Sequence, residues 1–140
     1  MIELIQTDVV TVPVGQTVPF DETAAKGGCA EYHRAGSGNI RLIKPGKYLI
    51  AFSANIAVPT GETVGEVSLG FIADNGILSG SIMRATPAAV EQYFNISSQH
   101  YVEVPICCGA VCCVDIAVQN TSDIPVLVDN ANITAVRVCG

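Results

Sequence analysis

The chain has no tryptophan and few charged residues, since Asp, Glu, Lys and Arg together make up 14% of its 140 residues. Its lysines are Lys26, Lys44 and Lys47, and they form no basic cluster. Contacts to nucleic-acid phosphates need clustered lysine and arginine. Because the formal net charge is −6 and no basic patch exists, we expect no nucleic-acid partner.

The sequence also lacks a segment for export or membrane insertion. Residues 1–8 contain no basic region followed by a long apolar run, so they predict neither a signal peptide nor a membrane span. We therefore expect a protein with no membrane partner, made in a cytoplasm, that stays there or leaves by assembly or lysis. The Gly-X-Y repeat of a collagen stalk is absent too.

Catalytic motifs are the third absence. The sequence has 2 histidines, His33 and His100, and neither lies in a motif that pairs a base with a serine or cysteine nucleophile. The histidine-rich metal motifs of cupin-type jelly-roll enzymes do not occur. We therefore expect no enzyme, no catalytic residue and no cofactor.

Apolar residues are abundant, at 49% of the chain, and occur in short runs between turn signals. Such runs, recurring every 8–12 residues or so, are typical of sandwiches and jelly rolls. We predict an all-β fold, an antiparallel jelly-roll sandwich of eight to ten strands. Residues 1–12 form an N-terminal strand segment, and residues 13–140 form the jelly-roll domain. Within these, we expect the first strand at residues 7–14 and a loop at residues 21–28.

The rest of the chain is organised around residues 44–58, where a Pro45-Gly46 turn precedes a long strand. Alternation divides this strand into one face with Tyr48, Ile50, Phe52, Ala54 and Ile56, and another with Leu49, Ala51, Ser53, Asn55 and Ala57. The second face is small and uncharged, whereas a face in water would carry charges. We therefore expect both faces to be covered, the second most simply by another subunit.

This stretch resembles a known family. Pro-Gly-x-Tyr-x-Ile-x-Phe at residues 45–52 is similar to the third strand of the tumour-necrosis-factor/complement globular-head superfamily. Residues 114–120 resemble its penultimate strand and residues 132–138 its closing strand. The resemblance covers residues 14–138 and implies a ten-stranded jelly roll that assembles as a compact homotrimer.

The trimer interface is predicted from the organising strand, the start of a later strand and the closing strand at residues 133–138. Its expected residues are Tyr48, Leu49, Ala51, Phe52, Tyr93, Phe94, Ile133 and Val136. The sequence leaves open which of them face the core and which face the trimer axis, because a shift of one residue in register exchanges the faces.

The N-terminal segment carries apolar side chains at Ile2, Leu4 and Ile5. We interpret them as an anchor that attaches the protein to a larger particle. Burial within the trimer is the alternative.

Most of the 6 cysteines lie close together, as Cys107, Cys108, Cys112 and Cys113. Their C-C-x3-C-C spacing is not a standard zinc pattern. A structural metal or cross-link is one interpretation. We favour the other, in which these cysteines pack as small apolar strand residues, because cytoplasmic synthesis keeps thiols reduced. We therefore predict no metal site.

These observations favour a structural protein: a trimeric jelly-roll head that decorates a virus particle, as a bacteriophage capsid-decoration or head-fibre protein. Its partner would be the major capsid protein and its location the virion surface. The alternatives are a trimeric head on a spore or bacterial cell surface, and a receptor- or glycan-binding module. Against the last stands the absence of tryptophan, because glycan sites usually need exposed aromatic side chains.

Overall fold

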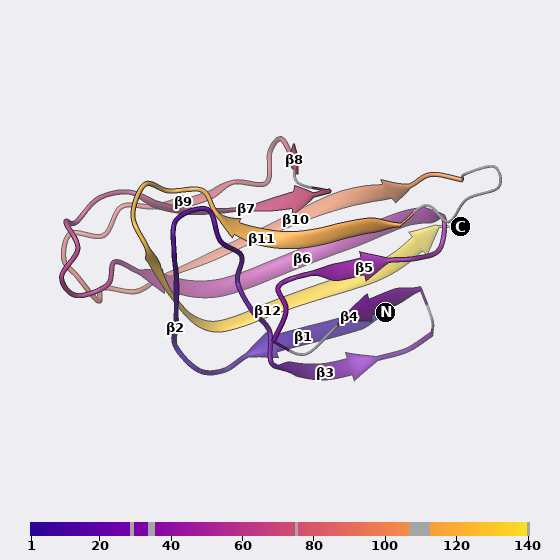
Figure 1. Ribbon diagram of the computed structural model, residues 1–140, viewed down its shortest axis with the longest axis horizontal. Helices are drawn as coiled ribbons and strands as arrows, with labels where there is room; N and C mark the ends of the chain where they lie inside the picture. Colours follow the sequence, from indigo (N-terminus) through magenta and orange to yellow (C-terminus); the bar gives the residue numbers. More distant parts are fainter. Residues whose placement is uncertain (29, 34–35, 75, 107–112, 140) are drawn as a thin grey trace.

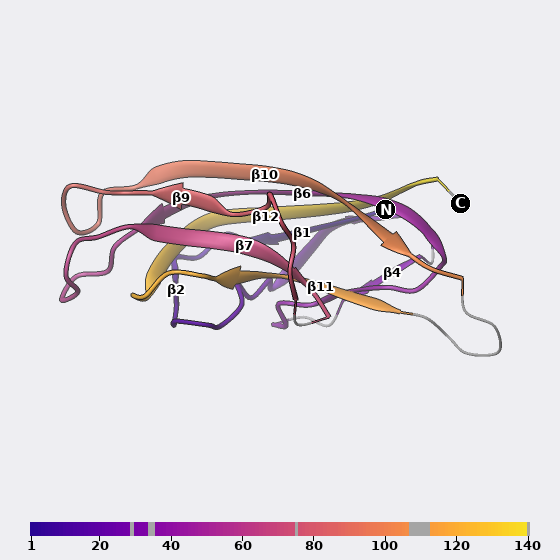
Figure 2. The same ribbon diagram turned by 90° about the horizontal axis from the view of Figure 1, so that it is seen from above.

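The computed structural model describes residues 1–28, 30–33, 36–74, 76–106 and 113–139. These residues form strands joined by turns and bends, and none of them is helical. Two antiparallel sheets lie one above the other as the two layers of a sandwich (Figure 2). The prediction of an all-β antiparallel sandwich is confirmed.

Sheet A, the first layer, has the strand order β10-β6-β12-β1-β3 (Figure 1). The short strand β2 pairs with the first residues of β12, before the part of β12 that pairs with β1. Its strands are β1 (Ile2–Gln6), β2 (Val10–Val12), β3 (Glu22–Lys26), β6 (Gly46–Ala57), β10 (Phe94–Val104) and β12 (Val126–Cys139).

Sheet B, the second layer, has the order β4-β5-β11-β7-β8, and β9 pairs with β7. Its strands are β4 (Glu31–His33), β5 (Ile40–Leu42), β7 (Val67–Ala73), β8 (Gly76–Ile77), β9 (Met83–Ala85) and β11 (Val114–Asn120). Neighbours in both sheets are often distant in sequence, which is characteristic of jelly-roll connections.

Strand β6 is the predicted organising strand, and its alternation is confirmed. The side chains of Tyr48, Ile50, Phe52, Ala54 and Ile56 point between the sheets and are all 2% exposed or less. Gly46 follows Pro45 with a φ of 138°, and a Cβ at this position would collide with the carbonyl oxygen of Cys139. The turn therefore requires glycine both for its φ and for the close approach of β12.

The centre of the core is a cluster of three phenylalanine rings that joins the two layers. Phe52 of β6 lies between Phe20, which precedes β3, and Phe71 of β7. The ring centroids are 6.5 Å and 6.4 Å apart, and both pairs are edge-to-face. Each ring is buried. This geometry is the preferred one for aromatic pairs and adds to the free energy gained by burying their area.

Three strand predictions were wrong, each because pairing with a distant strand overrides the local pattern. Residues 21–28 were expected to form a loop but contain β3, whose exposed polar residues are held at the sheet edge by β1. The single strand expected at residues 7–14 is only Val10–Val12, preceded by β1. The closing strand expected at residues 132–138 is the second part of a longer strand, β12, which spans Val126–Cys139 and has a register shift between Asp129 and Asn132.

The N-terminal residues are not a detached anchor. Strand β1 lies between β12 and β3 in sheet A, and Ile2 and Leu4 are 1% and 0% exposed. Their side chains belong to the core of the chain itself. The anchor prediction is therefore wrong for these two residues. Ile5, which points the other way, is half-buried and pairs with Asn132 across the sheet.

The buried Tyr48 hydroxyl makes stability sensitive to high pH. It donates a hydrogen bond of 2.7 Å to the Lys44 carbonyl oxygen. Burial, followed by the charge of Glu31, raises the pKa of Tyr48. An unfolded tyrosine ionises near pH ~10, so above that pH the unfolded chain loses this proton first. The stability that the neutral phenol contributes is therefore complete below about pH 10 and is lost as the pH rises through the folded pKa.

Tyr48→Phe should therefore unfold more easily at neutral pH, by about 1 kcal/mol for the lost hydrogen bond. Between about pH 9 and pH 11 its free energy of unfolding should fall less steeply than that of the wild type. Denaturant titrations across this range measure both effects. The exposed Tyr32→Phe is the matched control and should follow the wild type. Parallel pH profiles for Tyr48→Phe and the wild type would contradict the prediction.

Candidate subunit interface

The candidate site is the outward face of sheet A, which we call face A. On β10, β6 and β1 every second side chain points away from the core, and β12 alternates in the same way on either side of its register shift between Asp129 and Asn132. These outward residues are Asn95, Ser97, Gln99, Tyr101 and Glu103 on β10, Lys47, Leu49, Ala51, Ser53 and Asn55 on β6, Asp129, Asn132, Thr134 and Val136 on β12, and Glu3 and Ile5 on β1.

The strand register arranges face A in rows that change from apolar to polar. At one end Tyr101, Leu49 and Val136 stand side by side across three strands. Tyr101 is 67% exposed, which leaves most of a large aromatic side chain uncovered by this chain. The next two rows contain mainly serine, alanine, threonine and amide side chains.

Small side chains make the middle of face A concave. A hollow of about 460 Å³ lies over β6 and β10, lined by Ala51, Ser53, Ser97, Gln99 and Asn132 together with the strand backbone at Phe52 and Ser98. Larger side chains flank it at either end. A shape of this kind accommodates a protruding element of a second molecule.

The polar end of face A is formed by Asn95, Asn55 and Asp129. The amide of Asn95 donates a 3.1 Å hydrogen bond to Oδ1 of Asn55. Nearby, burial, together with the charges of Asp129 and Glu91, raises the pKa of Tyr93. This end therefore offers amides and a carboxylate, next to the exposed aromatic side chains of Tyr93 and Phe94.

The charged side chains of face A lie around its concave middle and not within it. The amide of Asn132 donates a 2.7 Å hydrogen bond to the Glu3 carboxylate. Two further charged residues lie at the margin of face A, where Lys47 of β6 stands opposite Glu103 of β10 in the strand register. The residues that line the hollow are all uncharged, so a second subunit can cover the hollow without burying an isolated charge, which would be costly.

The predicted interface residues divide into three groups. Leu49, Ala51 and Val136 lie on face A and are half-buried. Tyr93 and Phe94, 40% and 41% exposed, lie at the start of β10. The third group is Tyr48, Phe52 and Ile133, at most 2% exposed in the chain's own core.

The interface prediction is therefore wrong for Tyr48, Phe52 and Ile133, which alternate with the outward residues along the same strands. Sequence reasoning also missed Tyr101 as the exposed aromatic residue of face A. The sequence contains a signal for this exposure. Tyr101 alternates with the apolar Val102 and Val104, and so shares its face of the strand with the polar Gln99 and Glu103.

Of the clustered cysteines, Cys107, Cys108 and Cys112 lie outside the described residues. Cys113 is half-buried and Cys139 is exposed, and neither forms a disulfide with another described residue. Among the described residues no group of histidine, cysteine and carboxylate side chains is arranged to hold a metal ion.

No family model and no curated protein matches the sequence. Solved structures do match the fold. The globular domain of zebrafish complement 1qA superposes with a TM-score of 0.70 at 10% identity, over 98% of this chain and 95% of that one. The Eiger TNF of S. frugiperda superposes with a TM-score of 0.71 at 12% identity, over 98% and 92%.

A vertex protein has the same fold. The PRD1 vertex protein P5 matches with a TM-score of 0.56 at 16% identity, over 98% of this chain and 95% of that one. The chain thus shares the fold of these complement, TNF and vertex proteins, which is the fold that the sequence resemblance implied. At such identities the likeness shows the fold alone, and function has to be argued from the site.

Proposed function

We propose that the protein is a non-enzymatic structural head that forms a homotrimer through face A and decorates the surface of a virus particle, most simply a bacteriophage. Face A carries the proposal. It combines an apolar row, in which Tyr101 is exposed and Leu49 and Val136 are half-buried, with a concave middle lined by uncharged residues. Burying such a surface between subunits removes apolar area from water at little electrostatic cost.

The virion role is supported by the likeness to the PRD1 vertex protein P5, which shares the fold over 98% of this chain and 95% of its own. The described residues contain no helix long and apolar enough to cross a membrane. Ile2 and Leu4 of β1 belong to the core, so these two side chains are not available for contact with a major capsid protein.

The trimer is tested by the absolute mass of the purified protein, measured by light scattering with and without a reductant. We expect the mass of three chains in both conditions, because packing of face A and not cysteine cross-linking holds the subunits together. A trimer that dissociates on reduction would assign the contact to cysteines. A single-chain mass would refute the homotrimer.

The particle role is tested by labelling gradient-purified virus particles and spores from the source with an antibody against the protein. We expect labelling on the surface of intact virions. Labelling of spores or cell surfaces with bare virions would instead support the surface-head alternative and overturn the decoration role.

A further inference from the structure

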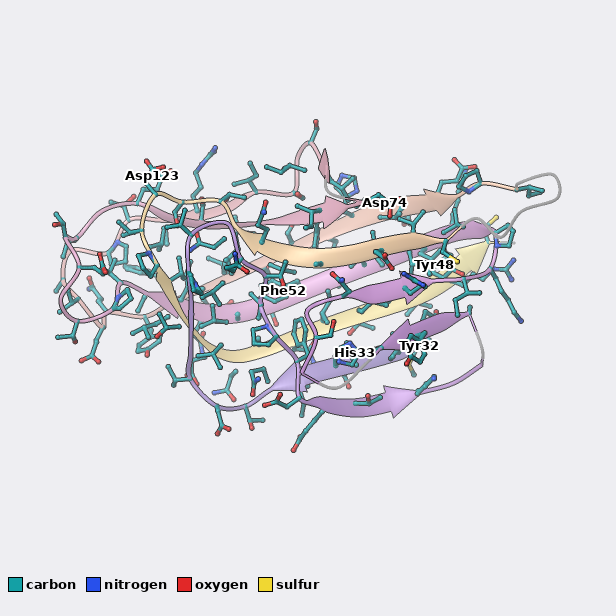
Figure 3. All side chains as sticks on the ribbon, viewed as in Figure 1. Tyr32, His33, Tyr48, Phe52, Asp74 and Asp123 are labelled. Carbon is teal, nitrogen blue, oxygen red and sulfur yellow. The ribbon has the colours of Figure 1, made fainter. Side chains whose placement is uncertain are left out.

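A second group of exposed side chains lies on the outward face of sheet B, on the opposite side of the sandwich from face A. Tyr32, Arg41 and Asp115 are adjacent across β4, β5 and β11 in the strand register. With Ser37 and Asn39 of the loop before β5 they line a pocket of about 260 Å³. Figure 3 shows Tyr32 beside β4, the edge strand of sheet B.

The aromatic side of this pocket is the ring of Tyr32. It is 54% exposed, although it lies in a paired strand. Among the described aromatic residues it is the exposed one on sheet B, because Tyr93, Phe94 and Tyr101 lie on or beside β10 of sheet A. An aromatic ring in this setting presents a flat apolar surface next to polar groups.

The polar side is a fixed ion pair. Arg41 Nε and Nη2 donate to the two Asp115 carboxylate oxygens at 2.9 Å and 3.2 Å. The Asp115 backbone N–H donates to Asp74 Oδ1 at 3.0 Å, and the Asp74 N–H donates to the Asp115 carbonyl oxygen. The remaining guanidinium N–H groups and carboxylate lone pairs place donors beside acceptors at a defined position.

The loop that completes the pocket is also held in place. The Ser37 hydroxyl accepts the Asn39 N–H at 3.0 Å, which leaves its own O–H free to donate. The loop exchanges backbone hydrogen bonds with Phe20 at both Gly36 and Ser37. His33 places one ring nitrogen 3.0 Å from the Asn39 carbonyl oxygen and the other 3.0 Å from that of Phe20. A ligand would therefore meet groups that are already ordered, which reduces the entropy cost of binding.

The charges of the pocket select the class of ligand. Arg41 is balanced by Asp115, and Asp74 adds a further negative charge next to the pair. The hydrogen bond and charge of Asp115 raise the pKa of Arg41, with a smaller contribution from Asp74. The net negative charge of these three side chains disfavours the binding of anions such as phosphate groups and acidic sugars. The volume, below the ~300–1,000 Å³ of sites for drug-sized ligands, suits a single ring.

We propose that this pocket binds a neutral sugar ring, with the apolar face of the sugar on Tyr32 and its hydroxyl groups on Arg41, Asp115 and Asn39. A sugar hydroxyl donates one hydrogen bond and accepts others, which matches a donor and an acceptor placed side by side. The site goes beyond the particle role. It lies away from face A and is complete within one chain, so a single subunit or a trimer would bind the sugar.

The test is a titration of the isotopically labelled protein with methyl glycosides of glucose, galactose, mannose and N-acetylglucosamine, followed by NMR, with sialic acid as an acidic probe. We expect at least one neutral glycoside to cause saturable shifts at Tyr32, Asn39 and Asp115, with millimolar affinity. Sialic acid should leave these signals unchanged. The proposal would be overturned if the neutral glycosides shift only signals of residues outside the pocket, or if no neutral glycoside causes a saturable shift. Saturable shifts with sialic acid alone would overturn it too.

Variants separate stacking from general loss of structure. Tyr32→Ala should weaken binding about tenfold, while Tyr32→Phe, which keeps the ring, should stay close to the wild type. Ile77→Ala, at an exposed position of sheet B, is the control and should bind normally. If Tyr32→Ala binds as well as the wild type, the ring does not contact the sugar and the site is wrong. These measurements use the isolated protein, so their failure would leave the virion role standing.

Discussion

Leu49→Glu should reduce the mass of the protein in solution from three chains to one. Leu49 is half-buried on face A and stands between Tyr101 and Val136 in the apolar row. In a single chain a glutamate here would remain at the surface, where substitutions usually change stability by less than ~0.5 kcal/mol. In the trimer it would be desolvated without a partner, at a cost of several kcal/mol for each copy. This expectation depends on the proposed interface. Light scattering measures the mass of the variant in solution.

The control for this experiment is Ile77→Glu. Ile77 is an apolar residue of β8 in sheet B and is 51% exposed, so the same change of charge occurs on the opposite layer. Ile77→Glu should remain a trimer. Circular dichroism should show that both variants keep the strand content of the wild type. A trimeric Leu49→Glu, or a monomeric Ile77→Glu, would place the subunit contact somewhere other than face A.

Phe52→Ala should destabilise the fold by about 3–5 kcal/mol, a large part of the ~5–15 kcal/mol that domains of this kind possess. Phe52 is 2% exposed and touches Phe20 and Phe71 edge-to-face, so its removal leaves a cavity between the two sheets. The neighbouring strands are held by their ladders and cannot close this space. Denaturant unfolding at neutral pH measures the loss.

Phe94→Ala is the matched control, because Phe94 lies on the neighbouring strand β10 but is 41% exposed. Both changes should be made in the Leu49→Glu background, so that subunit association does not contribute. Phe94→Ala should then cost less than ~1 kcal/mol. Equal losses for the two variants would mean that Phe52 is not the centre of the core, and that the tyrosine and phenylalanine positions of β6 were assigned to the wrong face.

The prediction of β6 shows how far local patterns extend. Residues 44–58 define a turn and an alternating strand without reference to any partner, because proline, glycine and the two-residue period act locally. The same pattern left the roles of the two faces open, since neither carries many charges. Tyr48 and Leu49 were therefore both assigned to the interface, although only one of them faces outward.

The edge strand β3 and the sugar pocket show where local patterns fail. Glu22–Lys26 has no apolar alternation, and it is a strand because β1 offers it a free edge. In the pocket, Arg41 and Asp115 are 74 residues apart in the chain, and the register of β5 and β11 alone makes them neighbours. Nothing in the sequence around either residue indicates the other.

The sequence by itself determined that this protein is an all-β sandwich with one long organising strand, because composition, turn residues and two-residue alternation depend on each residue and its immediate neighbours. Only the tertiary structure decided which face of that strand is core, that residues 2–6 lie inside the sheet, and that Tyr32 meets Arg41 and Asp115. These features depend on which distant strands pair and in what register, and a shift of one residue would reverse every side chain.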